Sequence, residues 1–190
     1  MSDLSLVREK LFDLIKACIR IGKVVLSSGK ETDFYFDGRT VTLHQEGVTL
    51  IASLLLEEIK NRPEIGAIGG PTSGADPIVS AVGVLAQQQN VPLGLFYIRK
   101  EAKGHGMQKQ IEGPPIPPGT GVFLVDDVLT TGGSLIRALD VVTENTEAKV
   151  MGTFILVDRQ EGGREKLEEA GLEVVSLFGK SDFSVLTKSP

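Results

Sequence analysis

The sequence has few of the residues that disulfide-rich and metal-binding proteins require. Its 190 residues include a single cysteine, Cys18, and only two histidines. One cysteine excludes an internal disulfide, and two histidines leave too few ligands for a Cys/His metal cluster. Cys18 shares an apolar helical face with Leu11, Leu14 and Ile15, so we expect it to pack in the core rather than to act as a nucleophile.

Long apolar runs and an excess of positive charge are also missing. No apolar run approaches the roughly 18 residues of a transmembrane helix, and the opening Met-Ser-Asp-Leu-Ser lacks the basic and apolar regions of a signal peptide. We therefore expect a cytoplasmic protein with no membrane association. The formal net charge of -5 and the pI near 5.1 argue against a nucleic-acid-binding surface. The length and the 41% hydrophobic content suit one well-buried domain, covering residues 1–190.

Apolar periodicity predicts helices alternating with strands. Helices are expected over the first twenty residues, from Glu46 to Lys60, from Asp76 to about Asn90, around 135–142, and between Gly163 and Gly171. Strands are expected at 24–26, 33–36, 65–68, 93–98, 122–125, 150–157 and 172–177. This order predicts an α/β fold with a mainly parallel sheet flanked by helices, which binds ligands at the carboxyl ends of its strands.

The run from Val122 to Ser134 has the features of a sugar-phosphate site. Four apolar residues lead directly into Asp126 and Asp127, whose carboxylates can accept hydrogen bonds from vicinal sugar hydroxyls. The following turn, Thr130 to Ser134, offers backbone N–H groups to a phosphate at a helix N-terminus. The simpler interpretation is a strand-to-helix connection with Ser134 as N-cap and solvated aspartates. The unbroken order of all these parts favours the site.

The segment 99–120 lacks apolar periodicity, which is unusual inside a compact domain. Glycines at 104 and 106 permit large backbone changes, and the same stretch has an unusual density of cationic residues: Arg99, Lys100, Lys103, His105 and Lys109. Cations on a mobile segment can close over a polyphosphate and neutralise a leaving group. An ordinary solvated loop is the alternative, but a neighbouring sugar-phosphate motif favours a lid.

Together these features resemble the type I phosphoribosyltransferases, whose signature is a hydrophobic strand, two acidic residues and a Thr/Gly-rich loop. Three further segments resemble the members that act on orotate: Leu26-Ser-Ser-Gly-Lys-Glu-Thr-Asp-Phe-Tyr-Phe-Asp37, Arg99-Lys-Glu-Ala-Lys-Gly-His-Gly106, and Asp158-Arg159. The resemblance extends from about residue 20 to residue 160. The first and third segments discriminate best, because other phosphoribosyltransferases share the acidic motif.

The resemblance implies a reaction of 5-phosphoribosyl 1-pyrophosphate with orotate, giving orotidine 5'-monophosphate and pyrophosphate in UMP biosynthesis. Mg²⁺ is expected on the donor pyrophosphate, with no direct protein ligand to the metal. The resemblance also implies a homodimer with shared active sites, because the mobile catalytic loop 99–120 reaches the neighbouring subunit. Residues of about 1–45 and the C-terminal segment are expected to form a small hood over the base.

The resemblance also assigns residue roles by position. The catalytic residues are Lys103, His105, Asp126 and Asp127. The donor-binding residues are Ser73, Arg99, Lys100, Lys103, His105, Asp126, Asp127, Val128, Leu129, Thr130, Thr131, Gly132, Gly133 and Ser134. Orotate is expected to contact Thr130, Arg159, Tyr35 and Phe36. An arginine suits the orotate carboxylate because its planar fork can bind in a bidentate manner.

Two positions depart from the pattern, and two other functions remain open. Some relatives have lysine where this chain has Ser27, and some have Tyr-Lys at Ser73-Gly74, so two phosphate-facing cations are absent. Lys30 is a partial substitute for the first, and the turn at 72–74 can offer backbone N–H groups instead. The alternatives are a phosphoribosyltransferase for a purine or another base, and a non-catalytic regulator that senses phosphoribosyl pyrophosphate and binds nucleic acid.

Overall fold

A six-stranded sheet in the order β5-β4-β3-β6-β7-β8 forms the centre of the molecule. The computed structural model describes residues 3–25, 31–101 and 110–188. The strands β3 (Ile65–Pro71), β4 (Gly94–Ile98), β6 (Gly121–Leu129), β7 (Lys149–Asp158) and β8 (Glu173–Gly179) run parallel, and β5 (Ile111–Glu112) pairs antiparallel with β4. The predicted α/β fold with a mainly parallel sheet is therefore confirmed.

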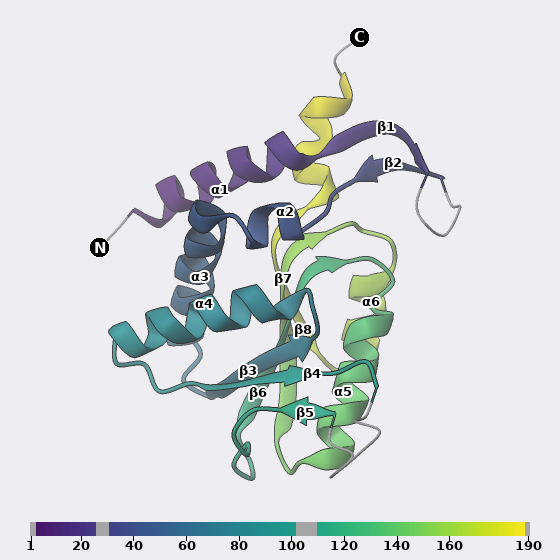
Figure 1. The fold of residues 1–190 in the computed structure, drawn as a ribbon. Helices are drawn as coiled ribbons and strands as arrows, with labels where there is room; N and C mark the ends of the chain where they lie inside the picture. The colour runs from purple at the N-terminus through teal and green to yellow at the C-terminus, as the bar shows by residue number, and fades with distance from the viewer. Residues whose placement is uncertain (1–2, 26–30, 102–109, 189–190) are drawn as a thin grey trace.

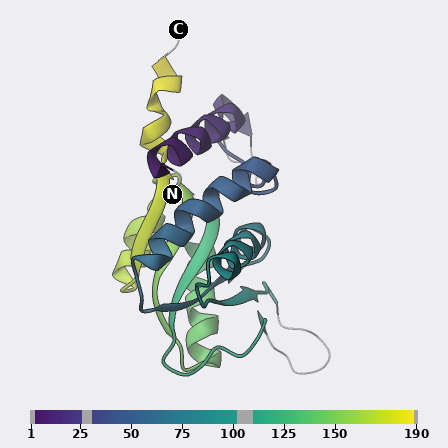
Figure 2. The ribbon, with the colours of Figure 1, turned by 90° about the vertical axis from the view of Figure 1, so that its left-hand side faces the viewer.

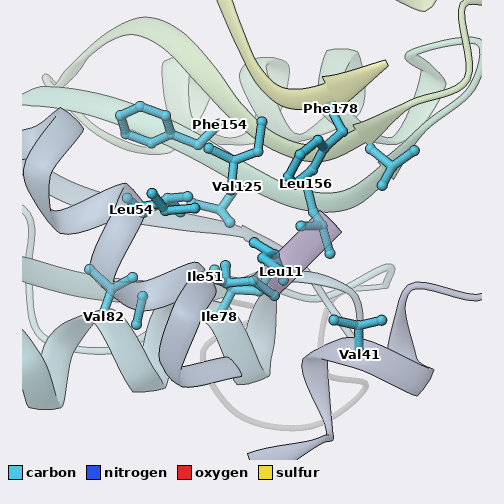
Figure 3. Packing of buried hydrophobic residues seen from close by; sticks show 14 of the residues in the cluster. Leu11, Val41, Ile51, Leu54, Ile78, Val82, Val125, Phe154, Leu156 and Phe178 are labelled. Carbon is cyan, nitrogen blue, oxygen red and sulfur yellow. The ribbon is translucent and has the colours of Figure 1, made fainter. Parts of the chain in front are cut away.

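Helices cover the two faces of this sheet (Figure 1). One face packs against α3 (Gln45–Lys60) and α4 (Ala75–Gln88), the other against α5 (Gly133–Asn145) and α6 (Gly163–Glu169). Successive side chains of a strand point to opposite faces. Accordingly, Phe123 and Val125 belong to the cluster with α3 and α4, whereas Val122 and Leu124 belong to the cluster with α5 and α6. Figure 3 shows part of the first cluster, to which Val125 and Leu54 both belong.

Elements from the N-terminal and C-terminal parts of the chain lie together above one end of the sheet (Figures 1 and 2). We call this region the hood: α1 (Leu4–Cys18), the antiparallel pair β1 (Arg20–Val25) and β2 (Glu31–Tyr35), α2 (Arg39–Thr42) and the 3₁₀ helix η1 (Lys180–Lys188). An aromatic cluster joins them to β8. Phe183 stacks on Phe12 at 4.8 Å between ring centres and lies 6.3 Å from Phe34 and 6.0 Å from Phe178.

Several element boundaries differ from the predicted ones. The strand predicted at 65–68 continues as β3 to Pro71 because glycine lets neighbouring strands approach closely: a Cβ on Gly70 would lie 2.0 Å from the Val125 carbonyl oxygen. The strand predicted at 122–125 continues as β6 to Leu129, so both aspartates lie inside it. The helix α4 begins at Ala75 with Gly74 as N-cap, and the predicted N-cap, Asp76, lies in its first turn.

Three short elements were not predicted: α2, β5 and η1. Each is too short or too weakly periodic to be recognised locally, and tertiary contacts stabilise it. The strand β1 also begins earlier than predicted, at Arg20, and β2 at Glu31. Among the described residues, no helix is both long and apolar enough to cross a membrane.

The aromatic cluster predicts how strongly the hood is attached. Phe183 is only 1% exposed, so Phe183→Ala should lower the free energy of unfolding by about 3–5 kcal/mol through lost burial and a residual cavity. Phe183→Leu retains most of the apolar volume and should cost clearly less. Urea denaturation of both variants measures the difference. A loss below about 1 kcal/mol for Phe183→Ala would show that the cluster does not anchor the hood.

Candidate functional site

Asp126 and Asp127 lie near the carboxyl end of β6, where the strand still pairs with β7 through the register Asp126↔Ile155 and Leu129↔Asp158. Strand alternation directs the two side chains differently. Asp127 lies against Gly38 of the hood, and Asp126 borders the turn before α5. Both carboxylates nevertheless reach Gly74, where a Cβ would lie 2.5 Å from one oxygen of each. The pair is therefore enclosed by backbone that has no side chain.

Burial changes the protonation of this pair. It raises the pKa of Asp126 well above the usual value, and the charge of Asp127 raises it further. Burial also raises the pKa of Asp127. The Asp127 N–H donates a hydrogen bond of 3.0 Å to Asp126 Oδ1, which opposes the shift without cancelling it. The ligand-free pair consequently holds a proton more tightly than free carboxyl groups do.

The turn that follows the aspartates lines a hollow of about 150 Å³. Gly132 is the N-cap of α5 and has φ 73°, a left-handed conformation that favours glycine. Ser134 is therefore inside the helix, and the alternative that made it the N-cap is wrong. The N–H groups of a first helical turn lack intrahelical acceptors, and the first turn of α5 has no acidic residue. This geometry suits an anion.

A larger cavity of about 550 Å³ adjoins the hollow and shares Asp126, Val128, Ser134 and Arg137 with it. Its lining comes from the hood, the β3–α4 turn, the ends of β4 and β5, and β6 with α5. It brings together these predicted site residues: Tyr35, Phe36, Ser73, Arg99, Lys100, Asp126, Asp127, Val128 and Ser134. The predicted residues Leu129, Thr130, Thr131, Gly132 and Gly133 line the hollow instead. The Thr72–Ser73 peptide bond beside the cavity is cis.

Arg159 is not among the residues that line either cavity. It follows β7, its N–H donates to the Leu129 carbonyl at 2.9 Å, and its guanidinium pairs with Glu161 at 2.7 Å. Its side chain is only 9% exposed. The preceding residue, Asp158, pairs with Arg164 at 3.1 Å and accepts the Gln160 N–H at 2.8 Å. The end of β7 is therefore firmly held.

Some predicted residues cannot be placed. Lys103 and His105, as well as Ser27 and Lys30, lie outside the described residues. Residues 99–101 and 110–120 of the predicted catalytic loop are described, and the Arg99 N–H donates to the Gln110 carbonyl at 2.9 Å. Arg99 also faces Glu112 at 3.6 Å. Arg99, Lys100 and Gln110 all line the larger cavity.

Arg39 and Arg137 line the larger cavity, although sequence reasoning singled out neither. Arg39 forms a fork with Asp37, with Nε–Oδ1 at 3.0 Å and Nη2–Oδ2 at 3.1 Å, and this hydrogen bonding lowers the pKa of Asp37. The sequence Asp37-Gly38-Arg39 places opposite charges two residues apart on either side of a glycine, and this spacing could have indicated the ion pair. At Gly74 a Cβ would lie 2.5 Å from an oxygen of each aspartate, so any side chain there would require both carboxylates to shift.

Comparisons with known proteins agree with this geometry. The family model described as phosphoribosyl transferase domain matches residues 39–175. Orotate phosphoribosyltransferase from Aquifex aeolicus is 42% identical over 186 residues, covering 94% of this chain and 98% of the relative. The Synechocystis sp. orotate phosphoribosyltransferase is 42% identical over 180 residues, covering 94% of this chain and 89% of the relative.

A solved structure is similar over nearly the whole chain. Mycobacterium tuberculosis H37Rv orotate phosphoribosyltransferase in complex with 5-phospho-alpha-D-ribosyl 1-diphosphate has a TM-score of 0.76 and 32% identity, covering 94% of this chain and 99% of that one. The chain belongs to the phosphoribosyltransferase family, which consists of pentosyl-transferring enzymes. Within that family it belongs to the orotate phosphoribosyltransferases.

The buried aspartates predict an inverted pH dependence of stability. Their raised pKa values mean that the folded protein binds protons more tightly than the unfolded chain, so stability is lost as pH rises above the usual carboxyl range. Asp126→Asn should therefore raise the melting temperature at neutral pH, by about 2–4 °C for each kcal/mol regained, and the gain should shrink toward pH 4. Melting curves across this range measure the effect.

The control is Asp140→Asn, which changes an exposed aspartate on α5. It should shift the melting temperature little at any pH. A stability gain for Asp126→Asn that is the same at all pH values would contradict the proton-binding account.

Proposed function

We propose that this chain transfers the phosphoribosyl group of 5-phosphoribosyl 1-pyrophosphate to orotate, giving orotidine 5'-monophosphate and pyrophosphate in UMP biosynthesis. The observation that best supports the proposal is the joining of two cavities at Asp126. The smaller cavity lies beside a helix N-terminus whose N–H groups suit an anion, and the larger one has room for a base and a pyrophosphate. The relatives named orotate phosphoribosyltransferase support the choice of base.

The roles of the described residues follow from the chemistry of displacement at the anomeric carbon. The bond from C1 to the pyrophosphate oxygen breaks, and the pyrophosphate leaves with its electron pair. A ring nitrogen of orotate forms the new bond to C1 and gives up its proton, which the pyrophosphate or water accepts. Positive charge develops on the sugar, and Asp126 with Asp127 would accept hydrogen bonds from the ribose hydroxyls and stabilise it. The turn from Thr130 to Ser134 would hold the 5'-phosphate.

Cations at the rim would stabilise the leaving group. Arg99 and Lys100 line the larger cavity. Lys103 and His105 follow them in the sequence, between Arg99 and Gln110, whose backbones are hydrogen-bonded to each other. Negative charge grows on the pyrophosphate as it leaves, so a cation placed there lowers the barrier. We assign the segment 99–120 the role of a catalytic loop that closes over the bound donor.

Tyr35 and Phe36 would form the edge of the base pocket, because both line the larger cavity on the hood side. Thr130 and Arg159 complete the proposed orotate contacts. Arg159 would have to exchange its ion pair with Glu161 for the orotate carboxylate, and its fixed backbone would keep that exchange local. We also propose that residues 1–190 form a single domain, in which about 1–45 and the C-terminal segment form the hood that binds the base.

Mg²⁺ would enter with the donor. The described residues include no group of three or more His, Cys, Asp or Glu arranged to hold a metal ion, and Mg²⁺ commonly takes its ligands from substrate phosphates and water. Bound there, it would neutralise charge on the pyrophosphate. The resemblance also supports a cytoplasmic homodimer in which the catalytic loop of one subunit serves the site of the other.

A base panel tests the reaction. With Mg²⁺ and 5-phosphoribosyl 1-pyrophosphate, purified protein should consume orotate in preference to uracil, adenine and hypoxanthine, measured by absorbance changes and product chromatography. The Asp126→Asn/Asp127→Asn variant should lose on the order of 10² or more in kcat/KM. Consumption of another base while orotate remains unchanged would refute the proposed substrate.

The same assay tests the proposed carboxylate contact. Arg159→Ala should raise the KM for orotate roughly tenfold or more, because it removes a charge-assisted hydrogen bond. The KM for the donor should change little. Equal damage to both KM values would assign Arg159 a structural role at the end of β7.

Subunit mixing tests the shared site. Lys103→Ala chains and Asp126→Asn/Asp127→Asn chains should each be nearly inactive alone. Mixed and re-associated, they should recover about a quarter of wild-type activity, because half of the dimers are mixed and each of those has one intact site. Activity that stays at the sum of the separate variants would argue against loops that cross between subunits.

A further inference from the structure

Arg137 lies where the two cavities meet. It lines both the hollow beside the Thr130 to Ser134 turn and the larger cavity. It sits one turn into α5, and long helical side chains point back toward the N-terminus of their helix. Its Nη1 accordingly lies 3.6 Å from the position of a Cβ on Gly133, the first residue of α5. The guanidinium of this exposed residue therefore lies beside Gly133, at the start of the turn's helix.

A phosphate bound in the hollow would require more positive charge than the lining residues other than Arg137 supply. A phosphate monoester carries a charge of about -1.5 to -2 at neutral pH, whereas a helix N-terminus supplies only about half a positive charge. Asp126 borders the same hollow and adds negative charge. Arg137 is the one cationic side chain among the described residues that line it.

The guanidinium of Arg137 has no hydrogen-bond or ion-pair partner among the described residues. Several other arginines of the fold are held by carboxylates: Arg39 by Asp37, Arg62 by Glu58 and Glu173, and Arg164 by Asp158. Arg137 forms no hydrogen bond or ion pair with any residue in 3–25, 31–101 or 110–188. Its planar fork matches the geometry of two phosphate oxygens, which a lysine cannot reproduce.

We propose that Arg137 binds the 5'-phosphate of the donor and of the product nucleotide, closing the open side of the turn. This inference rests on the proposed phosphoribosyl site but not on the identity of the base. The 5'-phosphate does not react, so its contacts have the same strength in the ground state and in the transition state. Arg137 therefore contributes uniform binding, which changes KM rather than kcat.

The test compares two fragments of the donor. Binding of ribose 5-phosphate and of inorganic pyrophosphate is measured by calorimetry for wild type, Arg137→Gln and Arg137→Lys. Arg137→Gln should weaken the binding of ribose 5-phosphate roughly tenfold to a hundredfold. Its affinity for pyrophosphate should stay within about twofold of the wild-type value. Arg137→Lys, which keeps the charge without the fork, should fall between. In steady-state assays, Arg137→Gln should raise the donor KM while kcat stays close to wild type.

Lys166→Gln is the matched control, because it removes one exposed positive charge from the helix that follows the neighbouring strand. It should alter neither fragment's affinity. Three results would overturn the inference. Arg137→Gln could weaken pyrophosphate binding while ribose 5-phosphate binding is unchanged, it could change neither affinity, or wild type could fail to bind ribose 5-phosphate. If orotate is not the base consumed but Arg137→Gln still loses ribose 5-phosphate, the proposed substrate fails and the role of Arg137 stands.

Discussion

The close packing of backbone around two half-buried carboxylates is the constraint on which the site depends. Asp127 lies against Gly38, where a Cβ would be 2.4 Å from its Oδ2, and both aspartates lie against Gly74. Any side chain at either glycine would displace the pair. Desolvation without a full set of partners costs free energy, which the folded chain bears until ligand hydroxyls arrive. The site is therefore organised for a ligand at the expense of stability, as functional sites commonly are.

Strand alternation divides the site into two compartments. Asp126 borders the hollow beside α5, which the turn and Arg137 also line. Asp127 faces the hood, where Tyr35 and Phe36 line the larger cavity. Adjacent carboxylates in an extended strand thus lie toward two different parts of the site. A helical segment would place neighbouring side chains only about 100° apart and would not separate the compartments in this way.

The parts of the fold that could be predicted are those with strong local signals. The alternation of strands and helices, the acidic pair in its run and the amphipathic α1 and α3 all have periodic or contiguous patterns. The unpredicted α2, β5 and η1 are short and depend on contacts from distant parts of the chain, such as the stacking of Phe183 on Phe12. Arg39 and Arg137 were missed for the same reason. Their importance lies in the cavity they face, which only the assembled sheet defines.

The clamp at the end of β7 has a consequence for ligand binding. Arg164 holds Asp158, donates to the Val174 carbonyl at 2.8 Å and reaches Ser176 Oγ at 2.7 Å, so it ties the residue before Arg159 to β8. Arg159 therefore projects from backbone whose conformational freedom is already lost. An arginine on a flexible loop would lose backbone and side-chain conformational entropy when it bound a ligand, and this loss would reduce the affinity. Here the backbone is already fixed and the side chain is held by Glu161, so the proposed contact with orotate would require one exchange of ion-pair partners and no ordering of the main chain.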